Sequence, residues 1–150
     1  MSMANGTIIL HADEVSLHVG GAPDASIEAN GDFAVDGHKV ATTAAEHALL
    51  AAYVQNVRDV REKGLSMGKT GVNMAVKAVS AAVSSSSGSA DKAADAGSKR
   101  IKTLNMAICN DTAAIKQAQD ALGNQLAAFK PYATIVGAAD VSDCMKDAND

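Results

Sequence analysis

The chain has 150 residues, of which 47% are hydrophobic and 20% are charged, and this composition is typical of a soluble globular domain. The low charge and the regular apolar pattern exclude a disordered chain, and the lack of an 18-residue uncharged apolar run excludes a transmembrane segment. The net charge of −4 is uneven, because residues 1–46 contain seven acidic residues and one lysine. Such an acidic region argues against a nucleic-acid partner.

Alanine contributes 31 of the hydrophobic residues. A methyl group buries little apolar surface, at about 25 cal/mol per Å², so we expect a thin core that needs a covalent bond or a packing partner. The chain also has only four aromatic residues and no tryptophan, which argues against a site that stacks sugars or bases.

Apolar and polar side chains alternate with a period of two over residues 7–40, which predicts β-strands. Val15, Leu17 and Val19, for example, alternate with polar residues. Asn30–Gly31 is a dipeptide that favours a type I′ hairpin, because both residues tolerate positive φ. We therefore predict a small antiparallel β-meander in this region.

From Thr43 onward the hydrophobic period becomes 3.6 residues, which predicts helices. Thr43 and Glu46 form a capping-box pattern that marks the helix start. We expect Gly64 to end this helix and a second helix to follow at Ser66–Val83, so that residues 43–83 form a helical hairpin. The small residues of the second helix would let another backbone approach closely.

A serine-rich stretch at residues 84–89 predicts a flexible linker. A long helix is predicted at residues 90–129, with a bend near Gly97 or Gly123. The proline after it ends this helix. The tail, residues 130–150, is expected to return and pack on the body of the domain, with its last six residues frayed.

These elements predict one α+β domain over residues 1–150. It consists of a small N-terminal antiparallel β-meander followed by a three-helix, alanine-rich helical region with a long C-terminal helix. The alanines concentrate between Ala44 and Ala128, whereas the meander holds β-branched residues. The thin part of the core is therefore expected among the helices.

The segment Gly64–Thr70, with the sequence G-L-S-M-G-K-T, resembles a phosphate-binding loop. Such a loop joins a strand to a helix and points backbone N–H groups at phosphates. Here the glycines are one residue too close, and an amphipathic helix precedes them. We therefore expect an interhelical turn with an exposed Lys69, and no nucleotide cofactor.

The four histidines, His11, His18, His38 and His47, lack the spacing of helical zinc motifs. His11 and His18 could face each other across a hairpin, but two ligands are fewer than zinc requires. Surface histidines without a metal are the favoured interpretation. The sequence also has no G-x-S-x-G motif, so no catalytic residue is assigned.

The two cysteines, Cys109 and Cys144, can pair if the tail returns along the long helix. A disulfide would close a loop of about 35 residues and stabilise the fold by about 4 kcal/mol in the chain-entropy model. The alternative is two free buried thiols. We favour the disulfide, which fits an oxidising compartment. Because Met1 and the residues after it do not read as a secretory signal, we expect that a signal peptide has been removed.

Three segments carry a family resemblance: I-E-A-N-G-D-F-A-V-D-G-H-K-V at residues 27–40, A-L-L-A-A-Y-V-Q-N-V within residues 43–60, and F-K-P-Y-A-T-I within residues 126–144. They resemble the bacterial envelope proteins grouped as the YggN-type domain of unknown function. The resemblance implies a periplasmic or lipid-anchored location and no catalytic residue. It also implies, in some bacteria, a role as immunity protein against effectors of type IV secretion, and it supports a bridge between Cys109 and Cys144.

The leading hypothesis is therefore a periplasmic immunity protein that binds a cognate secreted toxin and neutralises it by occlusion, not an enzyme. An acidic surface would raise the encounter rate with a basic toxin cleft. The candidate partner-binding residues lie around the predicted turns of the meander: Asp24, Glu28, Asp32 and Asp36.

The alternative is a non-catalytic structural or assembly protein of the envelope. In this hypothesis the Ala/Gly-rich helix Ser66–Val83 self-associates to form a homodimer. A dimer would also be compatible with the first hypothesis. An enzyme would require catalytic groups from distant segments to converge in a pocket.

Overall fold

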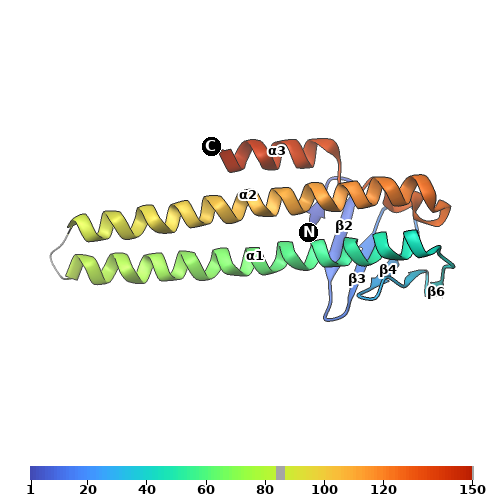
Figure 1. Cartoon of the computed structure of the whole chain (residues 1–150), viewed down its shortest axis with the longest axis horizontal. Helices are drawn as coiled ribbons and strands as arrows, with labels where there is room; N and C mark the ends of the chain where they lie inside the picture. Colours follow the sequence, from blue (N-terminus) through green and yellow to red (C-terminus); the bar gives the residue numbers. More distant parts are fainter. Residues whose placement is uncertain (84–86, 150) are drawn as a thin grey trace.

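The computed structural model describes residues 1–83 and 87–149, which form one antiparallel sheet, three α-helices and a short 3-10 helix (Figure 1). The predicted α+β class is confirmed. The elements are β1 (Ser2–Met3), β2 (Gly6–Leu10), β3 (Glu14–His18), β4 (Ala25–Glu28), β5 (Phe33–Val35), β6 (His38–Lys39), α1 (Ala44–Val83), α2 (Ser87–Gln125), η1 (Ala127–Tyr132) and α3 (Ala138–Asn149).

The sheet is a six-stranded meander in which each strand pairs with the next along the chain. Alternate side chains, such as Val15, Ile27 and Phe33, are buried against the helices because successive residues of a strand point to opposite faces. The sheet begins earlier than predicted, since β1 pairs Ser2 with Thr7. A two-residue strand is too short to show a period of two in the sequence.

One of the two short turns of the meander differs from the sequence expectation. At the first, Gly31 has a φ of 98° but Asn30 does not have a positive φ, so the predicted type I′ turn is wrong there. The backbone N–H of Gly31 donates to the carbonyl of Glu28, which fits a longer hairpin loop with a left-handed glycine. Both central residues have positive φ instead at Asp36–Gly37, as a type I′ turn requires.

The start of α1 follows the predicted capping box. The backbone N–H of Thr43 donates to Glu46 Oε1 at 3.0 Å, and the backbone N–H of Glu46 donates to Thr43 Oγ1 at 3.1 Å. Two backbone donors at the helix start are thus satisfied reciprocally. This contact fixes the point where the chain leaves the sheet.

The predicted helical hairpin within residues 43–83 is wrong, because α1 continues through Gly64 as a single helix to Val83. A glycine inside a helix costs only about 1 kcal/mol relative to alanine, and packing against a second helix outweighs that cost. Figure 1 shows α2 lying antiparallel beside α1. The segment Ser66–Val83, expected to self-associate, therefore runs next to a helix of its own chain.

The phosphate-loop-like segment Gly64–Thr70 is also helical. Neither a phosphate-binding loop nor the expected interhelical turn is present at this place, although Lys69 is exposed as predicted. Inside a helix the backbone N–H groups bond to the preceding turn and cannot gather around a phosphate.

The predicted serine linker is only partly within the structure, since residues 84–86 lie outside the described residues. Ser87–Ser89 belong to α2, so a linker is wrong for that part. Serine is favoured at helix starts, which explains why the helix begins there. The helix is continuous through Gly97 and Gly123, where the sequence predicts a bend, and it ends at Gln125, four residues earlier than predicted.

The tail returns along α2, as expected, and η1 and α3 are its helices (Figure 1). A disulfide joins Cys109 of α2 to Cys144 of α3, with the two Cα atoms 5.6 Å apart. The fully buried side-chain amide of Gln119 both donates to and accepts from the backbone of Val136 at 2.8 Å. These contacts attach the tail to the long helix at two points.

Residues 145–149 are not frayed, contrary to expectation. The final helix continues to Asn149, and Ala148 is buried with 3% of its surface exposed. The disulfide and the burial of this turn hold α3 against α2. Among the described residues, no helix combines the length and the apolar character that a membrane span requires.

The densest part of the core lies under the sheet. All four aromatic residues of the chain meet there in one cluster, with ring centroids 5.6 to 6.2 Å apart in tilted or edge-on pairs: Phe33, Tyr53, Phe129 and Tyr132. Aromatic side chains bury about 150–250 Å² each, far more than alanine. The thin core predicted from composition is therefore offset by this cluster at one end of the molecule.

Candidate functional site

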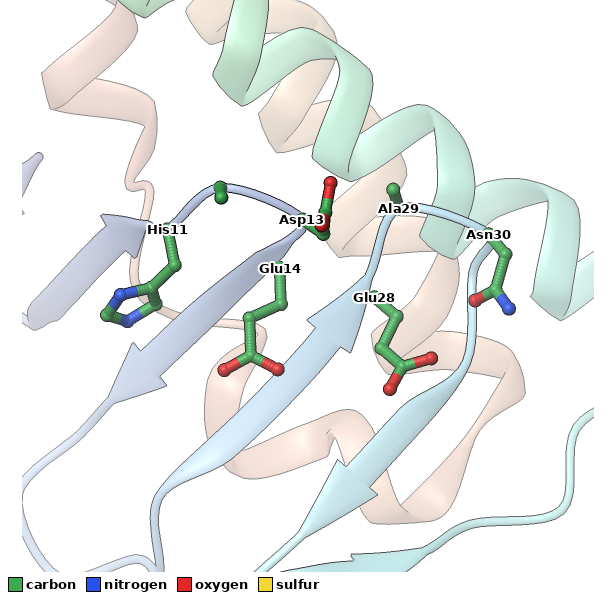
Figure 2. Close-up of a pocket in the computed structure, with 7 residues that line it drawn as sticks. His11, Asp13, Glu14, Glu28, Ala29 and Asn30 are labelled. Carbon is green, nitrogen blue, oxygen red and sulfur yellow. The ribbon is translucent and has the colours of Figure 1, made fainter.

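An open hollow lies at one end of the sheet, where the β2–β3 turn approaches the end of β4 (Figure 2). Its volume is about 640 Å³. We call it the acidic hollow, because three of its residues carry carboxylates. The lining residues are His11, Ala12, Asp13, Glu14, Glu28, Ala29 and Asn30.

Glu14 and Glu28 are direct partners in the register of β3 and β4. Figure 2 shows their side chains leaving the sheet in the same direction. Like charges directly opposite each other on neighbouring strands are destabilising. Within the described part of the chain neither glutamate forms an ion pair, so this repulsion is not relieved inside the protein.

The turn that carries Asp13 is fixed from two sides. Arg58 of α1 donates from Nη2 to the carbonyl of Ala12 at 3.0 Å, and the backbone N–H of Ala29 donates to the carbonyl of Asp13 at 2.9 Å. The Arg58 guanidinium is also 3.8 Å from Asp13 Oδ1. The carboxylate of Asp13 remains 96% exposed, so the turn is anchored through its backbone while its charge faces solvent.

The other border of the hollow is the loop between β4 and β5. Here the backbone N–H of Asp32 donates to Asn30 Oδ1 at 2.9 Å, and His47 Nε2 lies 3.2 Å from Asp32 Oδ1. Lys39 Nζ is 3.4 Å from the other carboxylate oxygen. Burial acts to raise the pKa of Asp32, but the hydrogen bonds from His47, Asn30 and Lys39 together hold this pKa below its ordinary value.

Gly31 allows this loop to approach α1 closely. A Cβ at this position would lie 2.4 Å from the carbonyl oxygen of His47, and the φ of 98° belongs to the left-handed region. Only glycine meets both conditions without strain. The border of the hollow is therefore held in place by a backbone contact with the first turns of α1.

The four acidic residues singled out from the sequence do not form one rim. Glu28 lines the hollow and Asp32 borders it, but Asp24 and Asp36 lie at the opposite end of the sheet. The backbone N–H of Asp36 donates there to the carbonyl of Asp24 at 2.9 Å. They are divided between the two ends because successive turns of a meander lie at alternating ends of the strands.

The carboxylate of Asp24, at the opposite end, has a partner within the protein. Asp24 Oδ1 is 2.8 Å from His18 Nδ1, and the Tyr132 hydroxyl donates to the carbonyl of Pro23. Burial, together with the nearby carboxylates of Asp24 and Asp36, raises the pKa of Tyr132. These contacts tie the turns at that end to η1.

Sequence reasoning missed Asp13 and Glu14 as parts of the site. Asp13 precedes β3 and Glu14 is its first residue. The clear signal of this strand is its alternating apolar residues, which says nothing of the acidic ones. A signal was present, however, in the register: pairing Val15 with Ile27 places Glu14 opposite Glu28.

The histidines are dispersed. His11 Nε2 lies 2.9 Å from Ser16 Oγ, while His18 pairs with Asp24, so the two do not face each other across the hairpin as considered from the sequence. The register places His18 opposite Thr7. In the part of the chain that the structure describes, no group of three or more His, Cys, Asp or Glu side chains is arranged to hold a metal ion.

One family model matches the chain, over residues 2–108, and its description is "Protein of unknown function (DUF2884)". No curated protein and no solved structure matches. The matched range includes the whole sheet, α1 and all residues of the acidic hollow. The disulfide between Cys109 and Cys144 lies just beyond it.

Proposed function

The chain belongs to the DUF2884 family, which is described as being of unknown function, and on this premise we propose that it is a binding protein whose acidic hollow receives a cationic segment of a protein partner. The observation that carries the proposal is the pair of glutamates, Glu14 and Glu28, that oppose each other without a counter-charge among the described residues. A cation placed between them would remove the repulsion and gain two charge-assisted hydrogen bonds.

The shape of the hollow suits a long basic side chain. It is open to solvent on the face of the sheet away from α1, whereas the side chain of Asp13 at its border is directed toward α1 (Figure 2). An arginine can bind carboxylates through several N–H groups at once. The same negative field would speed the encounter with a basic partner, an effect that falls with increasing salt.

We further propose that the partner is a secreted toxin and that this chain is a periplasmic immunity protein. Neutralisation by occlusion needs only a complementary surface with a few anchoring contacts. The resemblance to envelope immunity proteins supports this role. A disulfide between Cys109 and Cys144 is compatible with an oxidising compartment.

The experiment is binding to the effector encoded beside this chain, measured by calorimetry with purified proteins. Replacing both glutamates, E14Q/E28Q, keeps their size and removes the charges. We expect the dissociation constant to rise at least tenfold, about 1.4 kcal/mol. The matched control, D143N/D147N, removes two exposed carboxylates from α3 and should leave binding unchanged.

Two results would overturn the proposal. If no complex forms and the producing cells are not protected by co-expression of the chain, the immunity role is wrong. If a complex forms but E14Q/E28Q and D143N/D147N bind alike, the partner uses another surface and the acidic hollow is not the binding site.

A further inference from the structure

The last helix, α3, has few contacts with the rest of the chain apart from its disulfide. Of its twelve residues, Ala148 is the buried one. It runs antiparallel to α2, as three contacts along the two segments show: the side chain of Gln119 with the backbone of Val136, the disulfide of Cys109 with Cys144, and Lys102 Nζ donating to the carbonyl of Asn149 at 3.4 Å.

The side of α2 that faces α3 is polar. Residues three, four or seven positions apart lie on one face of a helix, so the contacts at Lys102, Cys109 and Gln119 define this face. Apart from the cysteine, its residues are polar: Lys102, Asn105, Thr112, Lys116 and Gln119. The hydroxyl of Thr112 donates to the carbonyl of Ile108 in its own helix rather than to α3.

The opposing stripe of α3 is apolar, because Val141, Met145 and Ala148 share a face with Cys144. Val141 and Met145 are only partly buried. Apolar side chains gain little from packing on a polar surface, since the driving force is the burial of apolar area on both partners. A separate helix of twelve residues is also marginal in water. The disulfide therefore provides much of what holds α3 in place.

We propose that residues 142–149 form a strap that is closed on α2 while Cys109 and Cys144 are joined and is released when they are reduced. The reductant is a dithiol. Cys144 is partly exposed whereas Cys109 is 1% exposed, so a thiolate of the dithiol attacks the sulfur of Cys144 and Cys109 leaves as a thiolate, which takes up a proton. The second thiol of the reductant then displaces Cys144, so the reductant becomes a disulfide and the chain gains two electrons and two protons.

The release has a boundary within the tail. Val136 keeps both hydrogen bonds to the buried amide of Gln119, and the hydroxyl of Tyr132 donates to the carbonyl of Pro23. Val141 packs against the core, so the first turn of α3 also has an attachment of its own. The strap begins after this turn. The proposal does not rest on the proposed function, because no residue of the acidic hollow takes part.

The test is an NMR comparison of the full oxidised chain with the chain in excess dithiothreitol. In the reduced chain the strap should lose its helical chemical shifts, and its amides should exchange with solvent at least about tenfold faster. The shifts of the sheet and of residues 127–136 should stay as they are. C144S should show the released strap without any reductant, and reoxidation of the unaltered chain with glutathione disulfide should restore the helical shifts.

Three results would overturn the proposal. A strap that stays helical after reduction would show that its other contacts are sufficient. A simultaneous loss of the sheet's shifts would show that the disulfide maintains the whole fold. Failure of the strap to close again on reoxidation would exclude a reversible switch.

The polar stripe is tested separately in the reduced chain. N105L/T112V gives α2 an apolar surface under the strap and should keep the strap helical after reduction. The matched control, T103V/N110L, makes the same changes at exposed positions on another side of α2, where the Thr103 hydroxyl also donates to a carbonyl of its own helix. The control should release its strap as the unaltered chain does. Equal release in the two variants would contradict the polar stripe as the reason that the strap opens.

Discussion

The two ends of the sheet both carry carboxylates, but only at one end do two glutamates face each other on neighbouring strands. At the end with Asp24, the acidic side chain pairs with His18 and the neighbouring turn is tied to Tyr132. At the other end, Glu14 and Glu28 face each other without a cation among the described residues. Proteins keep unfavourable local arrangements mainly where function requires them. The comparison therefore agrees with a structural role for the first end and with the binding role that we propose for the second.

The largest expected effect is the difference in stability loss between alanine substitutions at the turn glycines of the two ends, Gly31 and Gly37. G31A adds a Cβ 2.4 Å from a carbonyl oxygen at a φ of 98°, whereas the Cβ of G37A meets nothing within 4 Å at a φ of 79°. We expect G37A to lower the free energy of unfolding by about 1–2 kcal/mol, the cost of left-handed backbone. G31A should lose at least about 3 kcal/mol, because steric displacement adds to that cost. Urea denaturation measures both, and equal losses would contradict the close approach of this loop to α1.

Two buried tyrosines provide the second contrast. The hydroxyl of Tyr132 donates to the carbonyl of Pro23, but the hydroxyl of Tyr53 is buried without a hydrogen-bond partner among the described residues, and burial raises its pKa. Y132F should cost about 1 kcal/mol of stability, while Y53F should be neutral or slightly stabilising. Thermal and urea unfolding of the two variants test this difference. A loss in Y53F as large as that in Y132F would show that the Tyr53 hydroxyl has a partner.

The third contrast concerns the acidic pairs themselves. E14Q/E28Q should stabilise the chain by about 0.5–1 kcal/mol, because like charges across strands repel. D24N should instead lower stability slightly, since the carboxylate that His18 bonds to is lost. Unfolding at low and high salt provides the check, because the gain in E14Q/E28Q should shrink as salt screens the repulsion. A loss of stability in E14Q/E28Q would mean that the glutamates are structural.

The smallest expected effect is a pH dependence at the border of the hollow. The pKa of Asp32 is lowered in the folded chain, so its ionised form contributes stability above the unfolded pKa of 3.8, and this contribution is lost as pH falls through the folded pKa. The stability difference between the unaltered chain and D32N should thus be present at pH 6 and decline below pH about 4. A difference that persists unchanged at pH 2.5 would exclude the ionised carboxylate as its cause.

The sequence predicts those parts of the fold that depend on local signals. The capping box of Thr43 and Glu46, the antiparallel meander and the pairing of Cys109 with Cys144 are all found. The break at Gly64 is not, because the small helix penalty of one glycine is outweighed by tertiary packing along α2. A single glycine is therefore weak evidence for the end of a helix when that helix packs along another helix.

The candidate site was only partly predictable, because it depends on the register between strands. The sequence identifies Glu28 from its place near a turn, but the importance of Glu28 comes from Glu14 on the preceding strand. Asp36 also lies next to a turn, but this turn is at the end of the sheet opposite the acidic hollow. Charge counted along the chain does not reveal which end of a meander a residue occupies.

The most direct test of the account compares the affinity of the proposed toxin partner for two matched double variants, E14Q/E28Q and D24N/D36N. Each removes two carboxylates, one pair from each end of the sheet. The account predicts that E14Q/E28Q raises the dissociation constant at least tenfold and weakens its salt dependence, while D24N/D36N changes it less than about twofold. Equal affinities of the two variants, or a larger loss in D24N/D36N, would contradict the assignment of binding to the acidic hollow.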